Sequence, residues 1–460
     1  MLFNSLEFAV FFLAIFAAYW IVPVPMRKPL LLAGSLWFYA AWDWRFLGLI
    51  LLSAGTDFLC GHFLHLEERQ GARKTLLLVS IAVNLGILGF FKYFHFFVDS
   101  FRSVFPGIPQ PALEIILPVG ISFFTFQGLS YTVDIYRREL RPVSALEYFL
   151  FVAFFPQLLA GPIVRASEFL HQLRPMPRLD WSRTAEAALL FARGFCKKVF
   201  LANSLAGFAD PIFGNPGGYG AWDCLLAVYA FAFQIYFDFS GYTDMARGSA
   251  LSLGFRFPDN FSIPYLSASP REFWRRWHRT LSAWLRDYLY KSLGGDRKGG
   301  IFTLRNLFLT MALGGLWHGA NWTFVIWGCY HGTLLVLQRL LPGASRKDGE
   351  GPDPWRPVKI LFTFHLVCLG WVFFRAANLD LALRFLGRLT SGGWAWHASL
   401  EAVALGLAVC AAWQILSETV KTRRMEGGLW HGFHATATAI GVALALVFST
   451  ESAPFIYFQF

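Results

Sequence analysis

Long runs of apolar residues recur along the chain, and most of them approach the roughly 20 residues that a helix needs to cross a bilayer. They lie near Phe8–Val22, Leu30–Trp42, Phe46–Leu64, Leu76–Phe97, Leu113–Ile135, Leu146–Val164, Trp222–Phe239, Phe302–Trp317, Trp322–Leu341, Val358–Phe374, Ala402–Ile415 and Phe433–Phe448. Several runs are too short for a straight span, so we expect some helices to be tilted, re-entrant or placed where the membrane is thin. The pattern predicts an all-α polytopic membrane protein with roughly 10–12 transmembrane helices and further interfacial or re-entrant helices.

The composition indicates that lipid is part of the solvent of this protein. Hydrophobic residues make up 56% of the 460 positions and charged residues 15%, against about 25% charged residues in soluble domains. No internal repeat stands out, and we expect a single integral membrane domain over residues 1–460. The six cysteines show neither a CxxC pair nor a zinc-type spacing, which favours packing roles over disulfides or a metal site. The N-terminus lacks the basic region of a cleavable signal.

The net charge is +11, which in a membrane protein indicates the positive-inside bias and contact with anionic headgroups rather than nucleic acid. Three basic groups each lie two apolar runs apart, so they can share one side, provisionally the cytoplasm. They are Arg27 and Lys28, then Arg69, Arg73 and Lys74, then Arg137, Arg138 and Arg141. The next loop, Arg165 to Arg183, is also basic although it should lie outside. We interpret it as a sign of a re-entrant or interfacial segment, with a positive outer loop as the alternative.

The stretch Arg271 to Lys298 contains eight basic and three acidic residues and no run long enough to span a bilayer. A helical wheel over Phe273–Tyr290 predicts one amphipathic helix in or near the membrane interface. Its apolar face would hold Phe273, Trp274, Trp277, Leu281, Trp284, Leu285, Tyr288 and Leu289, and the opposite face Arg275, Arg276, Arg279, Arg286 and Asp287. His278 falls at the edge of the apolar face. It is equally compatible with a water-exposed interfacial residue and with a residue that faces a polar cavity.

Three of the 11 histidines lie in or beside apolar runs, and these are His318, His331 and His365. An ionisable residue at membrane depth is costly and usually functional, and histidine suits a general base near neutral pH. The glycines around His318 permit close approach, and tryptophans flank it, although a packed histidine bonded to a backbone carbonyl is the alternative. His331 would approach His318 only through a non-helical turn. His365 is expected to join two helices by a hydrogen bond.

Other chemical signatures are weak or missing. The sequence contains no HExxH, GxSxG or Walker motif. Asp238 and Asp244 stand at the end of an apolar run, where they could bind a cation or a proton. Capping of a following helix by Ser240 or Thr243 is equally plausible, so no catalytic role is assigned to them.

Several blocks resemble the membrane-bound O-acyltransferase family, and in particular its bacterial alginate O-acetyltransferase-like branch. They are PVGISFFTFQ (118–127), FPQLLAGPI (155–163), FDFSGYTD (237–244), WRRWHRTLSAWLRDYLY (274–290), LGG (293–295) and GLWHGANW (315–322). The motif-bearing part is about residues 1–331, and residues 358–460 match only as hydrophobic helices. The resemblance implies a ring of helices around a central funnel or tunnel, with His318 as the catalytic histidine and His278 as a second one.

The resemblance also implies acyl transfer from a cytoplasmic thioester, acetyl-CoA or an acyl carrier protein, without a tightly bound cofactor or metal. His318 would deprotonate a hydroxyl, and His278 or a backbone N–H near Gly314 would stabilise the oxyanion. An acyl-histidine relay is a variant of this route. Donor phosphates would meet Arg275, Arg276 and Arg279. The tunnel would be lined by Trp317, Trp322, Gly315 and Asn321.

The implied setting is the bacterial cytoplasmic (inner) membrane. The implied partners are membrane lipids, an exported polysaccharide such as alginate, and periplasmic proteins that complete acetyl transfer. Three alternatives remain open: transfer of D-alanyl or another acyl group to a cell-wall polymer, a transporter or flippase without covalent chemistry, and a non-catalytic scaffold.

Overall fold

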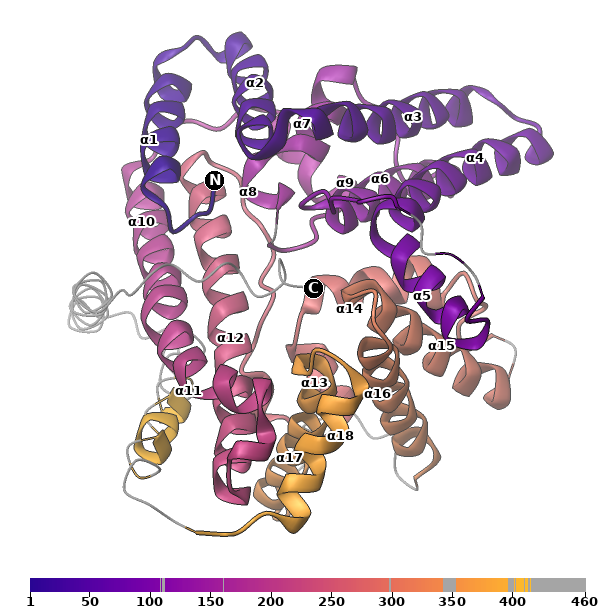
Figure 1. The fold of residues 1–460 in the computed structure, drawn as a ribbon. Coiled ribbons are helices and arrows are strands. Elements are labelled where there is room, and N and C mark those ends of the chain that lie inside the picture. The colour runs from indigo at the N-terminus through magenta and orange to yellow at the C-terminus, as the bar shows by residue number, and fades with distance from the viewer. Residues whose placement is uncertain are drawn as a thin grey trace. The chain divides into compact units, whose positions relative to one another are not determined.

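The computed structural model describes residues 1–107, 109, 112–159, 161–297, 299–341, 353–395, 401, 403–408, 410–412 and 414. Within these residues every regular element is a helix and none is a strand (Figure 1). The chain forms two compact units. Unit 1 consists of residues 1–191 and 243–258, and unit 2 of residues 192–242 and the described residues from 259 onward. Helices α10 (Trp181–Phe195) and α12 (Ala221–Ser252) contribute residues to both units.

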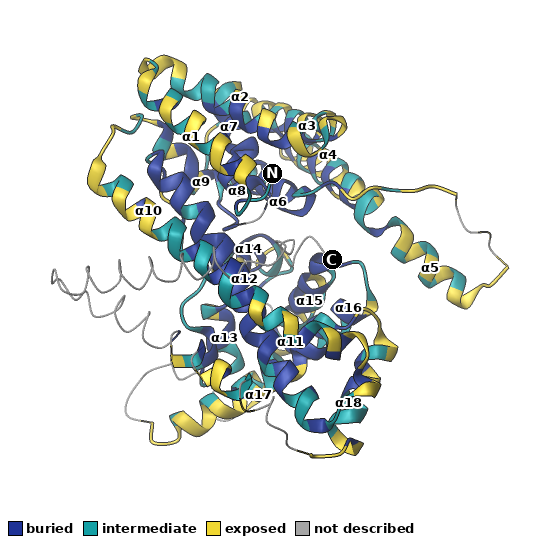
Figure 2. Cartoon of the chain, turned by 60° about the vertical axis from the view of Figure 1, so that its left-hand side comes forward, coloured by how far each residue is buried: buried dark blue, intermediate teal, exposed yellow. Residues whose placement is uncertain are grey.

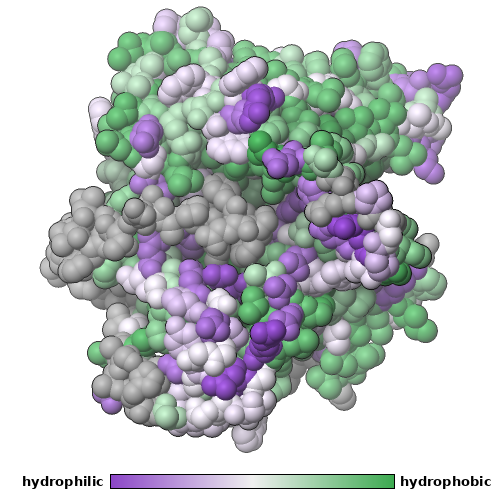
Figure 3. Space-filling view, in the orientation of Figure 1, coloured by the Kyte–Doolittle hydropathy of each residue, from purple (hydrophilic) through white to green (hydrophobic). Residues whose placement is uncertain are grey.

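The polytopic all-α fold is confirmed. Four helical stretches in the described part are long and apolar enough to cross a membrane: Val24–Leu66, Gln70–Val104, Ala221–Ser252 and Arg356–Arg375. Apolar side chains cover much of the visible surface in Figure 3, and Leu6, Ile21 and Leu78 are among the exposed ones. In contrast, α12 is buried along most of its length (Figure 2). The total of 10–12 spans and the central funnel stay predictions.

Unit 1 is built on helices that pack around α3, α4 and α6. Its elements are α1 (Leu6–Ile21), α2 (Val24–Asp43), η1 (Trp44–Phe46), α3 (Leu47–Leu66), α4 (Gln70–Leu88), η2 (Gly89–Tyr93), α5 (Phe94–Val104), α6 (Ile121–Tyr136), α7 (Ala145–Ala153), α8 (Phe155–Leu158), α9 (Ala166–Phe169) and η3 (Leu170–Leu173). Asp57 of α3 accepts hydrogen bonds from Ser80 and Asn84 of α4, and Ser80 also contacts Thr132 of α6. These buried bonds join the three helices where water is scarce.

The three basic groups predicted to share one side do so in unit 1. The guanidinium of Arg73 is buried and donates to the backbone oxygens of Leu64 and Tyr136, at the C-terminal ends of α3 and α6. This contact places the second basic group beside the third. Lys28 of the first group donates from Nζ to Glu147 Oε1 at 2.6 Å, directly after the third group.

The segment that follows α7 turns back on itself, which is compatible with the re-entrant interpretation of the basic loop Arg165–Arg183. Arg174 donates to Glu147, and Arg27 Nη1 donates to the backbone oxygen of Pro177 at 2.9 Å. The chain therefore returns to the side from which α7 started. Helix α7 has nine residues and α8 has four, and nine residues extend only about 14 Å. The expected continuous run Leu146–Val164 is thus interrupted at Phe154 and does not form one span.

Unit 2 holds the family's histidine motif. Its elements are η4 (Cys196–Ala202), α11 (Asn203–Gly214), η5 (Pro216–Gly218), η6 (Pro264–Leu266), α13 (Pro270–Arg276), α14 (Arg279–Trp284), η7 (Leu285–Tyr290), α15 (Gly300–His318), α16 (Trp322–Leu340), α17 (Arg356–Arg375) and α18 (Leu379–Ser391). Helices α15 and α16 form the tightest pair, and a Cβ on Gly315 would lie 2.8 Å from the Cα of Gly328. Only glycine fits where the two backbones approach this closely.

Sequence periodicity located the apolar helices better than the amphipathic ones. Helices α10, α11 and α18 lie outside the predicted apolar runs, because polar residues interrupt their sequences. Helix α6 begins only at Ile121, after Gly120 with φ 79°, rather than at Leu113. The predicted run Ala402–Ile415 is described in part, and Phe433–Phe448 lies outside the described residues.

Candidate active site

His318 is the last residue of α15 and is 4% exposed. Three aromatic rings surround it: Trp317, Trp327 and Phe374, with ring centroids 5.0, 5.0 and 5.3 Å from the imidazole centroid. The turn after His318 is equally crowded, because a Cβ on Gly319 would lie 2.2 Å from the ring of Phe324. The predicted burial of this histidine among aromatic walls and glycines is confirmed.

His278 is fully buried, at 0% exposure. The predicted amphipathic helix breaks at this residue: α13 ends at Arg276, α14 begins at Arg279, and His278 has φ 42° in the left-handed region. A wheel assumes one continuous helix, so it placed His278 wrongly at the edge of the apolar face. The water-exposed interpretation is therefore wrong. Phe239 of α12 packs edge-on against the imidazole, with centroids 4.7 Å apart.

The same tryptophan lies against both histidines. The Trp317 ring centroid is 5.0 Å from that of His318 and 6.3 Å from that of His278. The two histidines come from segments 40 positions apart in the sequence and meet around one indole. The pairing implied by the family resemblance is thus matched by the geometry of unit 2.

His278 has a defined polar partner. Its Nδ1 lies 3.0 Å from Oδ1 of Asn260, which also accepts from the backbone N–H of Thr280 at 3.3 Å and from its hydroxyl at 3.0 Å. Asn260 is 1% exposed. Burial lowers the pKa of His278 to about 3, because the charged ring would lose its hydration. His278 is therefore neutral at physiological pH and can accept a proton.

His331 packs against the same tryptophan as His318. The Trp327 ring centroid is 5.0 Å from that of His318 and 4.9 Å from that of His331. His331 stacks on Phe273 of α13, with an interplanar angle of 11°. The turn at Gly319–Asn321 does bring α16 back along α15, and both imidazoles contact the Trp327 indole, but we assign no shared chemistry to them.

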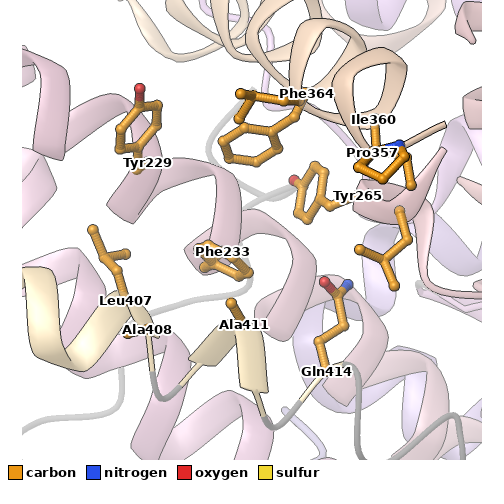
Figure 4. Close-up of a pocket in the computed structure, with 12 residues that line it drawn as sticks. Tyr229, Phe233, Tyr265, Pro357, Ile360, Phe364, Leu407, Ala408, Ala411 and Gln414 are labelled. Carbon is orange, nitrogen blue, oxygen red and sulfur yellow. The ribbon is translucent and has the colours of Figure 1, made fainter. Parts of the chain in front are cut away.

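His365 joins two helices, as predicted. Its Nε2 lies 2.8 Å from the hydroxyl of Tyr229, which links α17 to α12. Tyr229 borders an apolar cavity of about 550 Å³, which Figure 4 shows between α12, α17 and the residues Leu407, Ala408, Ala411 and Gln414. Phe233, Tyr265 and Phe364 line its walls, whereas His278, His318 and His331 are not among its lining residues. The cavity is separate from the histidine cluster.

The residues expected to line a tunnel have different surroundings. Trp317 lies in the histidine cluster, as described above. Gly315 packs against Gly328 inside the helix pair, where the nearby backbone N–H groups are engaged in helical hydrogen bonds rather than open to an oxyanion. Asn321 caps α16, accepting from Thr323 N–H at 3.0 Å. Trp322 is 54% exposed, because the chain reverses just before it, and Trp327 takes the expected place beside His318.

The three candidate donor-binding arginines differ in accessibility. Arg275 and Arg279 are exposed. Arg276 is held by Glu272, whose Oε1 accepts from it at 2.6 Å and from Arg356 at 2.9 Å. Arg276 is therefore committed to an ion-pair network, whereas Arg275 and Arg279 are the more exposed of the three arginines.

Asp238 and Asp244 lie inside the continuous helix α12, so there is no following helix for Ser240 or Thr243 to cap, and that interpretation is wrong. Asp238 forms an ion pair with Lys198 at 2.5 Å, and both side chains are 3% exposed. Asp244 lies 3.6 Å from Arg247. Sequence reasoning missed Lys198, Asn260 and Trp327 as neighbours, because each reaches its partner through tertiary packing.

The comparisons with known proteins show the family to which this chain belongs. The model of the membrane-bound O-acyltransferase family matches residues 38–379. This match extends beyond His331, the last residue of the motif-bearing part. A probable alginate O-acetylase, AlgI, of Azotobacter vinelandii is 44% identical over 86% of this chain and 79% of its own. The peptidoglycan O-acetyltransferase of Helicobacter pylori is 36% identical over 87% and 82%. The teichoic acid D-alanyltransferase of Bacillus subtilis is 31% identical over 58% and 71%. The chain belongs to the membrane-bound O-acyltransferase family.

Proposed function

We propose that this protein transfers an acetyl group from a cytoplasmic thioester toward hydroxyls of an exported polysaccharide, as a multi-pass protein of the bacterial cytoplasmic membrane. The observation that carries the proposal is the burial of His278 and His318 around Trp317 in a chain that belongs to an O-acyltransferase family. The relatives named as acetyl-transferring proteins cover most of this chain, and they favour acetyl over other acyl groups.

The chemistry asks little of the protein beyond positioning and proton transfer, because a thioester is already activated. A neutral imidazole removes the proton of the attacking hydroxyl, whose oxygen forms a bond to the acyl carbon. The tetrahedral intermediate then collapses with cleavage of the C–S bond, and the imidazolium returns its proton to the departing thiolate. Aromatic walls around His318 exclude water and so protect the thioester from hydrolysis.

The donor is acetyl-CoA or an acetylated carrier protein, and both carry phosphate or acidic groups. Arg275 and Arg279 supply exposed positive charge next to the segment that bears His278. Periplasmic proteins that pass the acetyl group to the polymer fit the same scheme, in which this chain performs the membrane step.

The test uses purified protein in proteoliposomes, supplied with a thioester labelled in its acyl group and with an oligosaccharide acceptor. Appearance of labelled acetyl on the acceptor, or on a supplied periplasmic partner, supports the proposal. Preferential use of a D-alanyl carrier would instead match the Bacillus subtilis relative. Movement of acceptor across the membrane without any labelled product would favour a transporter.

A further inference from the structure

We propose that Asn260 holds His278 in the tautomer protonated at Nδ1, so that Nε2 is the proton-accepting atom of this ring. Asn260 is then a positioning residue for acyl transfer, and His278 is a base rather than only an oxyanion donor. The inference rests on the proposed function for its catalytic meaning, whereas the tautomer itself follows from contacts within unit 2.

The orientation of the Asn260 amide is the first step. A backbone N–H can only donate, and that of Thr280 points at Asn260 Oδ1 at 3.3 Å. Exchanging the oxygen and nitrogen of the amide would set two donors against each other at this position. The hydroxyl of Thr280 donates to the same oxygen at 3.0 Å. The atom of Asn260 that faces His278 is therefore the oxygen.

The tautomer of His278 follows from that orientation. The distance of 3.0 Å between Nδ1 and Oδ1 is an ordinary hydrogen bond. An amide oxygen carries no hydrogen, so Nδ1 must supply it. In the neutral imidazole the other nitrogen then holds an unprotonated lone pair. Phe239, Trp317 and the Asn260 amide contact the ring and are all uncharged, so none of these three described groups stabilises an imidazolium before the reaction begins.

The remaining nitrogen is available for a substrate. Nε2 of His278 is buried and has no hydrogen-bond partner among the described residues, and the same holds for Nδ2 of Asn260. A buried acceptor without a partner is costly and marks a position that a ligand completes.

The main chain fixes this arrangement from both sides. The backbone N–H of Arg279 donates to the Asn260 oxygen at 2.9 Å, and that of Ser262 donates to the Arg276 oxygen at 3.0 Å. These bonds hold His278 in a left-handed conformation, φ 42°, that residues other than glycine rarely adopt. Such strain is retained at functional positions where the surrounding structure fixes the geometry.

The test compares Asn260→Ala and Asn260→Asp with Asn306→Ala. Asn306 is a matched control, because it is fully buried on α15 and donates to the Gly295 oxygen without contacting either histidine. Loss of an orienting partner should lower kcat by about 10–100-fold with a smaller change in the donor KM. A carboxylate also accepts from Nδ1, so Asn260→Asp should retain more activity than Asn260→Ala. It should also move the acidic limb of the pH–rate profile to higher pH, because its charge favours the imidazolium.

Nitrogen-15 NMR of histidine-labelled protein gives a readout independent of activity, with the His278 signals assigned by their absence in His278→Gln. We expect a protonated Nδ1 and an unprotonated Nε2 at neutral pH, and loss of that preference in Asn260→Ala. The opposite tautomer, or wild-type kcat and pH profile in both Asn260 variants, would overturn the inference. If wild-type protein transferred no acyl group at all, the proposed function would fail while the NMR result still decided the tautomer.

Discussion

Two segments of this molecule are each predicted as one continuous helix, and they differ in what their interruption achieves. The run Leu146–Val164 in unit 1 is interrupted at Phe154, and the stretch Phe273–Tyr290 in unit 2 is interrupted at Trp277 and His278. In unit 1 the break returns the chain to a basic face, where Glu147 is neutralised by Lys28 and Arg174. In unit 2 the break buries His278 with one ring nitrogen unpartnered among the described residues.

The break in unit 1 determines the path of the chain, whereas the break in unit 2 serves the chemistry. A broken helix with its charged group fully paired sets the path of the chain and stabilises it. The break in unit 2 instead buries a titratable ring. One amide orients that ring, and its other nitrogen can accept a proton. Substitutions in the two segments should therefore affect different quantities: activity in unit 2, and stability in unit 1.

The largest effect is expected from His318→Ala. Removing the imidazole at the centre of the aromatic cluster should abolish acetylation of the polymer in cells, because His318 matches the family's catalytic histidine and the loss of one proton-transfer group alone costs about 10²–10⁴-fold. The variant should still insert and fold, since an alanine fits among Trp317, Trp327 and Phe374. Acetyl content of the secreted polymer is the measurement, and His365→Ala, which loses the contacts of that ring with the Tyr229 hydroxyl and the Leu361 backbone oxygen, is the control. Normal acetylation by well-expressed His318→Ala protein would remove His318 from the site.

His278→Ala should cause a large but incomplete loss of activity, about 10²-fold in kcat, as expected for a single proton-transfer group. The initial rate of acyl transfer at saturating donor is the measurement. A wild-type rate would mean that His278 only packs within the broken segment. The break in unit 2 would then serve structure alone, as the break in unit 1 does.

Glu147→Gln should have the smallest effect on chemistry and a measurable one on stability. Burial alone would raise the pKa of Glu147, but hydrogen bonds from Arg174 and Lys28 lower it to about 2. A carboxyl whose pKa is depressed in the folded state stabilises the protein above its unfolded pKa, about 4.3. This stabilisation is lost as pH falls from there toward 2.

The glutamine variant should lose about 1 kcal/mol at neutral pH, a modest value because Arg174 is largely exposed. Its melting temperature should fall less steeply than that of the wild type below about pH 4.3, the unfolded pKa. Thermal unfolding in detergent across this range measures both effects. A strong loss of kcat in the folded variant would contradict the division between the two segments.

Much of the fold was accessible from sequence because lipid imposes simple rules on it. Apolar runs predicted most of the long helices, and the unexpected positive charge of Arg165–Arg183 pointed to a segment that turns back toward the start of α7. The amphipathic helices α10, α11 and α18 escaped this reasoning, since a run-length criterion detects only helices that are apolar on most sides.

The site was predicted less completely than the fold. Glycines and tryptophans in one motif identified His318 directly. The wheel failed for His278 because the helix breaks at that residue, and no periodicity connects Asn260 to a ring 18 positions later in the sequence. Trp322 and Trp327 both flank the motif, and only the turn after His318 decides that Trp327 is the one that contacts it.

The most direct test of the central claim is a side-by-side measurement of acyl transfer by purified wild-type, His278→Ala, His318→Ala and doubly substituted protein in the same lipids. If the two histidines act as one unit, their effects are not additive, and the double variant should lose no more activity than His318→Ala alone. Transfer that survives in His318→Ala, or losses that simply multiply in the double variant, would contradict a shared active site around Trp317.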